Sequence, residues 1–232
     1  MINIYQEKNL NILASSYLPL DERMYTLISG GKVIVVDPNV DEEMIDFLKQ
    51  NSVSDITVIV THCHYDHISG LNRLQGEFNC TVIGTEKCIV NLESPRRNLS
   101  KYANLVFMAH GFSKEEAPEI PPFSCHGDIG FEDEYRFAFN GHEVLLKAFP
   151  GHSDDGLMLL LDRRFLFTGD NLIPETATAL TLPGSSKKEY EEITKPFLLT
   201  RPEDTMVFPA HKDAGMIKDI LNNHPDYSKE EI

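Results

Sequence analysis

The sequence contains no apolar stretch that reaches the roughly 18 residues required for a membrane-spanning helix. Its beginning, MINIYQEKNLNILASSY, lacks the basic start and apolar core of a secretory signal. Cysteine is scarce, and the thiols at Cys63, Cys80, Cys88 and Cys125 form no CxxC pair. This pattern indicates free thiols in a reducing compartment. We therefore expect a cytoplasmic protein with no membrane partner.

Positive charge is scarce as well. The 232 residues include 21 Lys and Arg against 36 Asp and Glu, which gives a net charge of −15. Runs of Lys and Arg never exceed a pair, and such a surface repels nucleic acid phosphates. We expect a small-molecule substrate and no nucleic acid partner. The length fits a single domain spanning residues 1–232.

Short apolar runs alternate with helical patterns along the chain. Met44, Ile45 and Leu48 share one face of a predicted helix that has acids in its first turn. The run ITVIV is typical of a strand covered on both faces. We expect strands at 24–29, 32–37, 56–60, 80–84, 134–139, 142–149, 156–162, 164–170 and 205–209, and helices at 41–50, 85–92, 187–199 and 212–223, with one more helix ending at Leu74. The alternation favours a sandwich of sheets with helices outside.

Residues 94–132 break this alternation. They mix prolines, charges and aromatics with weak periodicity. Structureless segments of such length inside a compact domain are usually functional or disordered. The aromatic residues exceed what a solvated linker needs, so we interpret the segment as an irregular insertion that serves as a lid or as a contact in a homodimer.

The segment THCHYDH, residues 61–67, concentrates metal-binding side chains directly after the run ITVIV. In extended backbone, residues two apart point to the same side, so His62 and His64 can face one ion while Cys63 turns away. Asp66 and His67 can reach a second centre. Imidazole and carboxylate are natural ligands of zinc and of iron.

Three further candidates each follow a predicted strand. His152 lies in FPGHSDDG, Asp170 in FLFTGDN and His211 in VFPAHKD. Any one of them is more simply explained as a capping or turn residue. Together they supply the ligands that residues 61–67 lack, at turns where side chains converge on one edge of a sheet, and we interpret them as parts of one metal site.

The combination H-x-H-x-D-H, PGH, TGD and PAH resembles the metallo-β-lactamase superfamily, and within it the glyoxalase II-like hydrolases, from about Tyr25 to His211. The resemblance implies an α/β fold, the αβ/βα four-layer sandwich, with the site at the edge of its two sheets. It also implies two divalent metal ions, zinc in the first place and iron or manganese as alternatives. In this allocation the first ion is held by His62, His64 and His152, the second by Asp66, His67 and His211, and Asp170 bridges the two.

The resemblance implies a metal-dependent hydrolase of thioesterase or esterase type. Two zinc ions would activate a hydroxide that attacks a thioester, ester or lactone carbonyl, and Asp66 would have a catalytic part by orienting it. A phosphodiesterase acting on a small phosphodiester and a mononuclear iron persulfide dioxygenase are the alternatives. Thr61 and Asp37 are candidates for fixing the histidine tautomers.

Two departures from the family pattern concern substrate recognition. The sequence GHSDDG places Asp154 and Asp155 beside the third histidine, where we expect them to face solvent or to shape the charge preference. The chain ends shortly after His211, whereas glyoxalase II enzymes continue into a helical region that grips glutathione. Glutathione recognition is therefore open.

Overall fold

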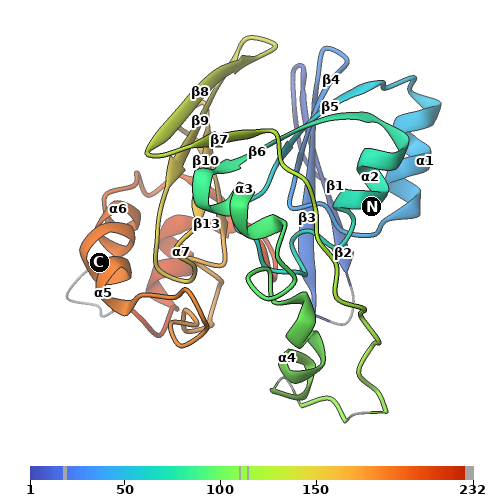
Figure 1. The fold of residues 1–232 in the computed structure, drawn as a ribbon. Helices are drawn as coiled ribbons and strands as arrows, with labels where there is room; N and C mark the ends of the chain where they lie inside the picture. Colours follow the sequence, from blue (N-terminus) through green and yellow to red (C-terminus); the bar gives the residue numbers. More distant parts are fainter. Residues whose placement is uncertain (18–19, 110, 114, 228–232) are drawn as a thin grey trace.

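A seven-stranded sheet forms the first half of the protein in the computed structural model, which describes residues 1–227 apart from 18, 19, 110 and 114 (Figure 1). Its strands lie side by side in sequence order: β1 (Ile2–Glu7), β2 (Leu10–Tyr17), β3 (Glu22–Ser29), β4 (Lys32–Val36), β5 (Asp55–Ile59), β6 (Asn79–Thr85) and β7 (Ile129–Phe131). The pairs from β1 to β4 are antiparallel, and those from β4 to β7 are parallel.

A six-stranded sheet forms the second half, in the order β13-β12-β11-β10-β9-β8. Its strands are β8 (Glu134–Phe139), β9 (His142–Ala148), β10 (Leu157–Leu161), β11 (Phe165–Gly169), β12 (Met206–Pro209) and β13 (Gly215–Met216). Within the described residues of this second sheet, β11 and β12 form a parallel pair and all other neighbouring strands are antiparallel. The β8–β9 hairpin turns at Asn140 and Gly141, which have φ values of 47° and 91° and so adopt the left-handed conformations that tight hairpins require.

The two sheets face one another across the main hydrophobic core. This core joins residues of both sheets, among them Leu27, Ile34, Leu146, Leu159 and Phe208. On the outer face of the first sheet lie α1 (Glu42–Gln50), α2 (Leu71–Glu77) and α3 (Glu86–Leu92), and on that of the second lie α5 (Lys187–Glu189), the π-helical η2 (Tyr190–Thr194), α6 (Lys195–Leu199) and α7 (Ile217–Asn222) (Figure 1). The expected αβ/βα four-layer sandwich is confirmed.

Local sequence explains why these helices form. In α1, Asp41 caps the first turn by accepting a hydrogen bond from the Met44 amide at 3.2 Å, and the predicted apolar face is buried. The predicted helix 187–199 is interrupted by η2 just before Pro196. Proline cannot donate to the preceding turn, which disfavours a regular α-helix there.

Other parts of the fold also differ from the sequence predictions. The hairpin of β1 and β2 was not predicted, although Leu10, Ile12 and Leu13 of β2 are buried. The predicted helix 212–223 is wrong at its start, because Gly215 and Met216 pair with β12 as β13 and the helix begins only at Ile217. Pairing with another strand there outweighs local helical preference.

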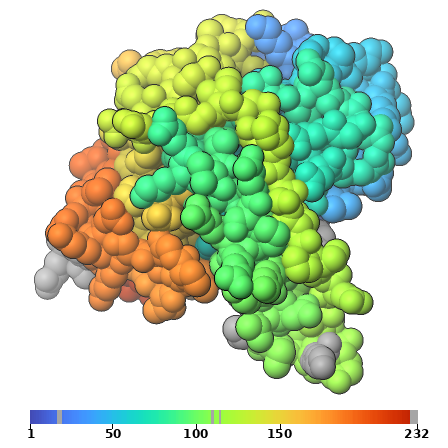
Figure 2. Space-filling model, in the orientation of Figure 1, coloured from blue at the N-terminus to red at the C-terminus, as the bar shows by residue number. Residues whose placement is uncertain are grey.

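Most of the segment 94–132 projects from the sandwich, whereas its last part forms β7 of the first sheet (Figures 1 and 2). It contains η1 (Ser100–Tyr102) and α4 (Ala103–Ala109), so it is less irregular than expected. Leu99, Ala103 and Phe107 form a small core with Tyr65, which lies between two predicted metal ligands. The projection is therefore anchored to the segment 61–67. In the part of the chain that the structure describes, we find no helix long and apolar enough to cross a membrane.

Candidate metal centre

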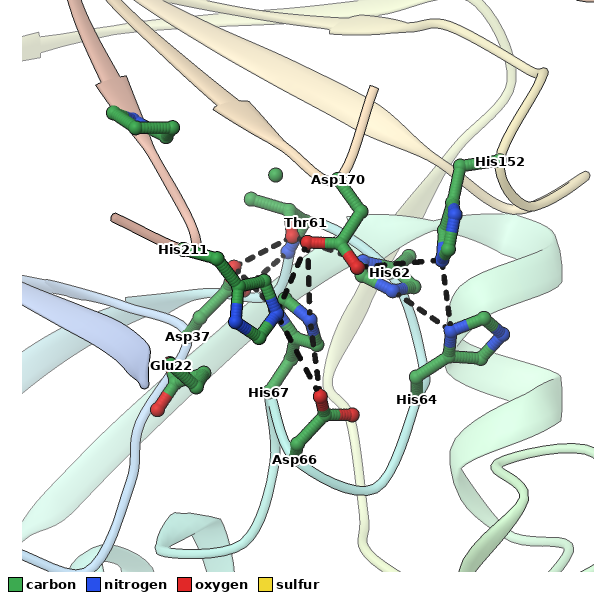
Figure 3. Close-up of polar contacts among 12 residues, drawn as sticks. Glu22, Asp37, Thr61, His62, His64, Asp66, His67, His152, Asp170 and His211 are labelled. Carbon is green, nitrogen blue, oxygen red and sulfur yellow. Dashed lines mark hydrogen bonds and ion pairs between the residues drawn. The ribbon is translucent and has the colours of Figure 1, made fainter. Parts of the chain in front are cut away.

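Four loops bring the predicted ligands together at one edge of the sandwich (Figure 3). Residues 61–67 follow β5, His152 follows β9, Asp170 follows β11 and His211 follows β12. The strands β11 and β12 are parallel neighbours, so the residues after them emerge at the same edge. The structure places all seven predicted side chains in this one cluster.

The first group consists of His62, His64 and His152, all buried. The His64 Nδ1 atom lies 3.0 Å from His62 Nε2 and 3.1 Å from His152 Nε2. In a tetrahedral zinc site with Zn–N bonds of 2.0–2.1 Å, two ligand nitrogens lie about 3.3 Å apart. The three nitrogens thus converge as the ligands of one small cation do.

The second group consists of Asp66, His67 and His211. One Asp66 oxygen lies 3.8 Å from both His67 Nε2 and His211 Nε2. These separations are wider than in the first group but remain within the range of atoms around a common cation. In Figure 3 this group lies at the His211 end of the cluster, and His64 and His152 lie at the other.

Asp170 lies between the two groups. Its Oδ2 atom is 3.5 Å from His152 Nε2, and its Oδ1 atom is 3.5 Å from His67 Nε2 and 3.4 Å from His211 Nε2. The carboxylate therefore presents one oxygen to each group. Gly169 permits this approach, because its φ is 52° and a Cβ atom there would lie 2.8 Å from the Thr61 hydroxyl.

Asp37 fixes two histidine rings through a hydrogen-bond network. Its carboxylate accepts hydrogen bonds from the Thr61 amide at 2.7 Å, the Thr61 hydroxyl at 2.6 Å and His67 Nδ1 at 3.0 Å. Because the hydroxyl donates to Asp37, it accepts from His62 Nδ1 at 3.2 Å. Both rings then carry their proton on Nδ1 and turn an unprotonated Nε2 toward the cluster in the neutral form.

Backbone and amide contacts hold two more of the histidines. His211 Nδ1 donates to the Leu20 carbonyl at 3.0 Å, which leaves its Nε2 directed at Asp170 and Asp66. The His152 amide donates to the Asn171 side chain at 3.1 Å, and the Asn171 amide group donates to the Phe149 carbonyl at 2.9 Å. Sequence reasoning did not identify Asn171, although it directly follows Asp170.

Two buried acids also contribute to the surroundings of the cluster. Glu22 is fully buried and accepts a hydrogen bond from Asn39 at 2.8 Å; sequence reasoning missed both, since neither stands out from its neighbours. Asp155 does not face solvent as expected. It is buried and accepts hydrogen bonds from Ser153 at 2.5 Å and Asn91 at 2.8 Å, while Asp154 is partly exposed.

The electrostatics differ between the two groups. Burial and the neighbouring histidines hold the pKa of His62 well below its usual value, and burial and His152 lower the pKa of His64 to about 4. Burial also disfavours charge on His67, but the carboxylates of Asp170 and Asp66 outweigh it and raise the pKa of His67 well above its usual value. The histidines of the first group are therefore neutral, whereas the carboxylates beside His67 stabilise a positive charge in the second group.

Buried polar atoms without hydrogen-bond partners also indicate that a cation binds in the cluster. The buried side-chain atoms without such a partner in the described part of the chain include His67 Nε2 and Asp170 Oδ1. An unpaired buried polar atom costs about 1–3 kcal/mol. Both atoms belong to the cluster and are ligand atoms in the predicted allocation, so the side chains present fit divalent cations of the zinc or iron type.

Comparison with known proteins identifies the family of the chain. Residues 19–211 match the family described as the metallo-beta-lactamase superfamily. A probable metallo-hydrolase of Streptococcus pyogenes serotype M6 is 28% identical over 207 residues, which cover 88% of this chain and 84% of the relative. A hydroxyacylglutathione hydrolase of Haemophilus ducreyi is 24% identical over 193 residues, which cover 83% of this chain but 66% of that enzyme.

Solved structures show the same architecture. The crystal structure of the B3 metallo-beta-lactamase BLEG-1 superimposes with a TM-score of 0.80 at 21% sequence identity. The superposition covers 94% of this chain and 99% of that one. At this identity the likeness concerns the fold, and the chemistry has to be argued from the side chains of the cluster.

Proposed function

The chain belongs to the metallo-beta-lactamase superfamily, and from that membership we propose that it is a metal-dependent hydrolase of thioesters, or of related esters or lactones. The observation that carries the proposal is Asp170, which presents one oxygen to each of two ligand groups. A binuclear site suits hydrolysis, because two cations can act on the nucleophile and on the carbonyl oxygen together.

We propose two zinc ions as the cofactors. His62, His64 and His152 would hold the first, Asp66, His67 and His211 the second, and Asp170 would contact both. When bound, the ions supply a hydroxide nucleophile near neutral pH and polarise the substrate carbonyl. The two carboxylates, Asp66 and Asp170, offset much of the ionic charge within the site.

The protein's own residues orient this site. Asp37 and Thr61 hold His62 and His67 in the tautomer that directs Nε2 inward. The Leu20 carbonyl does the same for His211. Asp66 is the proposed catalytic residue, because its carboxylate lies at the partly exposed edge of the cluster and can accept a hydrogen bond from the attacking water.

The proposed substrate is a small molecule. The name of the Haemophilus ducreyi relative favours a thioester, and the net charge of −15 disfavours nucleic acid. We also propose a cytoplasmic location, because the four cysteines are free thiols, as expected in a reducing compartment.

Metal analysis and a substrate panel test the proposal. We expect about two equivalents of zinc and turnover of acyl thioesters in a panel that also holds lactones, p-nitrophenyl phosphodiesters and glutathione persulfide. About one equivalent of iron with persulfide oxidation would assign the dioxygenase function instead. Selective cleavage of the phosphodiesters would assign the phosphodiesterase function, and either result would refute the thioesterase proposal.

A further inference from the structure

A cavity of about 610 Å³ adjoins the first histidine group. Two of its lining residues connect it to the cluster, because Cys63 lies between His62 and His64 in the chain and Ser153 follows His152. The cavity continues along α3 and the turn after it, and the segment around Gly184 closes its other side. In Figure 2 these are the green surface of α3 and the orange surface beside it.

The cavity gathers positive charge on a strongly acidic protein. Lys87, Arg96 and Arg97 line it together with the acids Glu86 and Asp154, so its lining has one positive charge in excess, whereas the whole chain has a net charge of −15. Lys87 is neutralised by Asp154 at 3.5 Å. Neither Arg96 nor Arg97 forms an ion pair with an acid within the described ranges, and both side chains are exposed.

Hydrogen bonds link Arg97 to the loop that carries His152. Arg97 Nη1 donates to the Asn91 side-chain oxygen at 3.4 Å, and Asn91 in turn donates to the buried Asp155 at 2.8 Å. Asp155 lies in the loop of His152, so Arg97 is connected to the first histidine group through Asn91. The cavity also has an apolar side, where Val90 is 57% exposed beside Pro183.

We propose that this cavity binds an anionic group of the substrate, a carboxylate or a phosphate remote from the scissile carbonyl, with Arg96 and Arg97 as its donors. Guanidinium groups bind such anions with two parallel hydrogen bonds. The apolar side at Val90 suits the carbon chain between the anion and the reacting carbonyl. The inference rests on the proposed hydrolase function and specifies its substrates as anionic.

Matched pairs of thioesters test this inference on the metal-loaded enzyme. The first pair is S-acetyl-3-mercaptopropionate and its methyl ester, and the second is S-acetyl-4′-phosphopantetheine and S-acetylpantetheine. A third pair, the succinyl thioester of N-acetylcysteamine and its methyl ester, carries the charge on the acyl side. We expect kcat/KM to favour the charged member of at least one pair by roughly tenfold, the size of one charge-assisted hydrogen bond. The preferred pair distinguishes carboxylate from phosphate.

The double variant Arg96→Gln with Arg97→Gln should abolish that preference. The matched control is Arg136→Gln, because Arg136 is an exposed arginine of β8 that pairs with Glu134 and Glu143 and lies outside the cavity. It should keep the preference of the wild-type enzyme. Equal turnover of both members of all three pairs, or a preference that survives in the double variant, would overturn the inference.

A binding measurement separates this inference from the hydrolase proposal. The thioether 3-(methylthio)propionate has no thioester bond to cleave, so its binding can be measured by NMR titration against its methyl ester, also after chelator treatment. We expect the carboxylate to bind roughly tenfold more tightly and the double variant to lose this difference. Binding without turnover of any thioester, ester or lactone would refute the hydrolase proposal alone, and turnover without charge-dependent binding would refute this inference alone.

Discussion

His67 donates a hydrogen bond from Nδ1 to the carboxylate of Asp37 at 3.0 Å, across 30 positions of sequence. The contact sets which ring nitrogen faces the cluster, and the same carboxylate acts on His62 through the Thr61 hydroxyl. One buried acid that is itself no predicted ligand therefore orients a histidine of each group.

Replacing Asp37 with Asn should weaken metal binding more than it changes the fold. The amide keeps the size of the carboxylate but cannot accept from all three donors, so the tautomer of His67 is no longer fixed. We expect zinc affinity to fall roughly 10–100-fold, measured by competition with a chromogenic chelator. Asp55→Asn is the control, since Asp55 is exposed and accepts hydrogen bonds from Ser54 and Asn79. Equal affinity in both variants would contradict the role of Asp37.

His64→Ala should abolish turnover and lower the metal content by about one equivalent, since it removes one ligand of three in the first group. The circular dichroism spectrum should remain that of the wild type, because His64 lies in a loop beyond β5. His126→Ala serves as the control, as the His126 side chain is 71% exposed. Full activity of the His64 variant would rule out the proposed centre.

Metal binding by the chelator-treated protein should release protons. The carboxylates of Asp170 and Asp66 outweigh burial and raise the pKa of His67, so His67 carries a proton at pH 7 that a cation must displace. Affinity should therefore rise with pH until the pKa of His67 is passed, by up to about tenfold per unit. Calorimetry in two buffers of different ionisation enthalpy measures the number released, and a value of zero would contradict the protonation of His67.

Phe107→Ala should loosen the projecting segment. Phe107 is fully buried and contacts Tyr65 and Phe112 edge to face, so its loss should lower the local stability by about 3–5 kcal/mol. Faster hydrogen exchange of the amides in 99–112 would measure this. Leu105→Ala is the matched control on the same helix; Leu105 is 63% exposed, and the change should stay within about 0.5 kcal/mol. Similar exchange in both variants would argue against a core at Phe107.

The four thiols should resist alkylation in the native protein. Burial raises the pKa of Cys80 to about 11 and that of Cys125 to about 12, and it raises the pKa values of Cys63 and Cys88 further. At pH 8 the thiolate fraction of Cys80 is then roughly one in a thousand. Mass spectrometry after iodoacetamide treatment should show no adducts without urea and four with it. Alkylation of native Cys80 at the rate of free cysteine would contradict this.

The parts of the fold that sequence predicted correctly depend on neighbours along the chain. The face of α1 and its cap at Asp41 lie within one helix, and the turn at Asn140 and Gly141 needs only its own two residues. The burial of Leu10 and Ile12 in β2 depends on core residues of the second sheet, and β13 depends on its pairing with β12. The burial of Asp155 likewise depends on Asn91, 64 positions away, so the local sequence gave no sign of it.

The amino-acid sequence by itself determined which ligand types are present and that each follows a strand, because strand ends and residue chemistry are local properties. The tertiary structure alone decided that His64 and His152, 88 positions apart, bring their nitrogens within 3.1 Å, and that Asp170 presents one oxygen to each group. Those distances depend on how the two sheets pack face to face around one core, and packing is set by contacts that no short stretch of sequence contains.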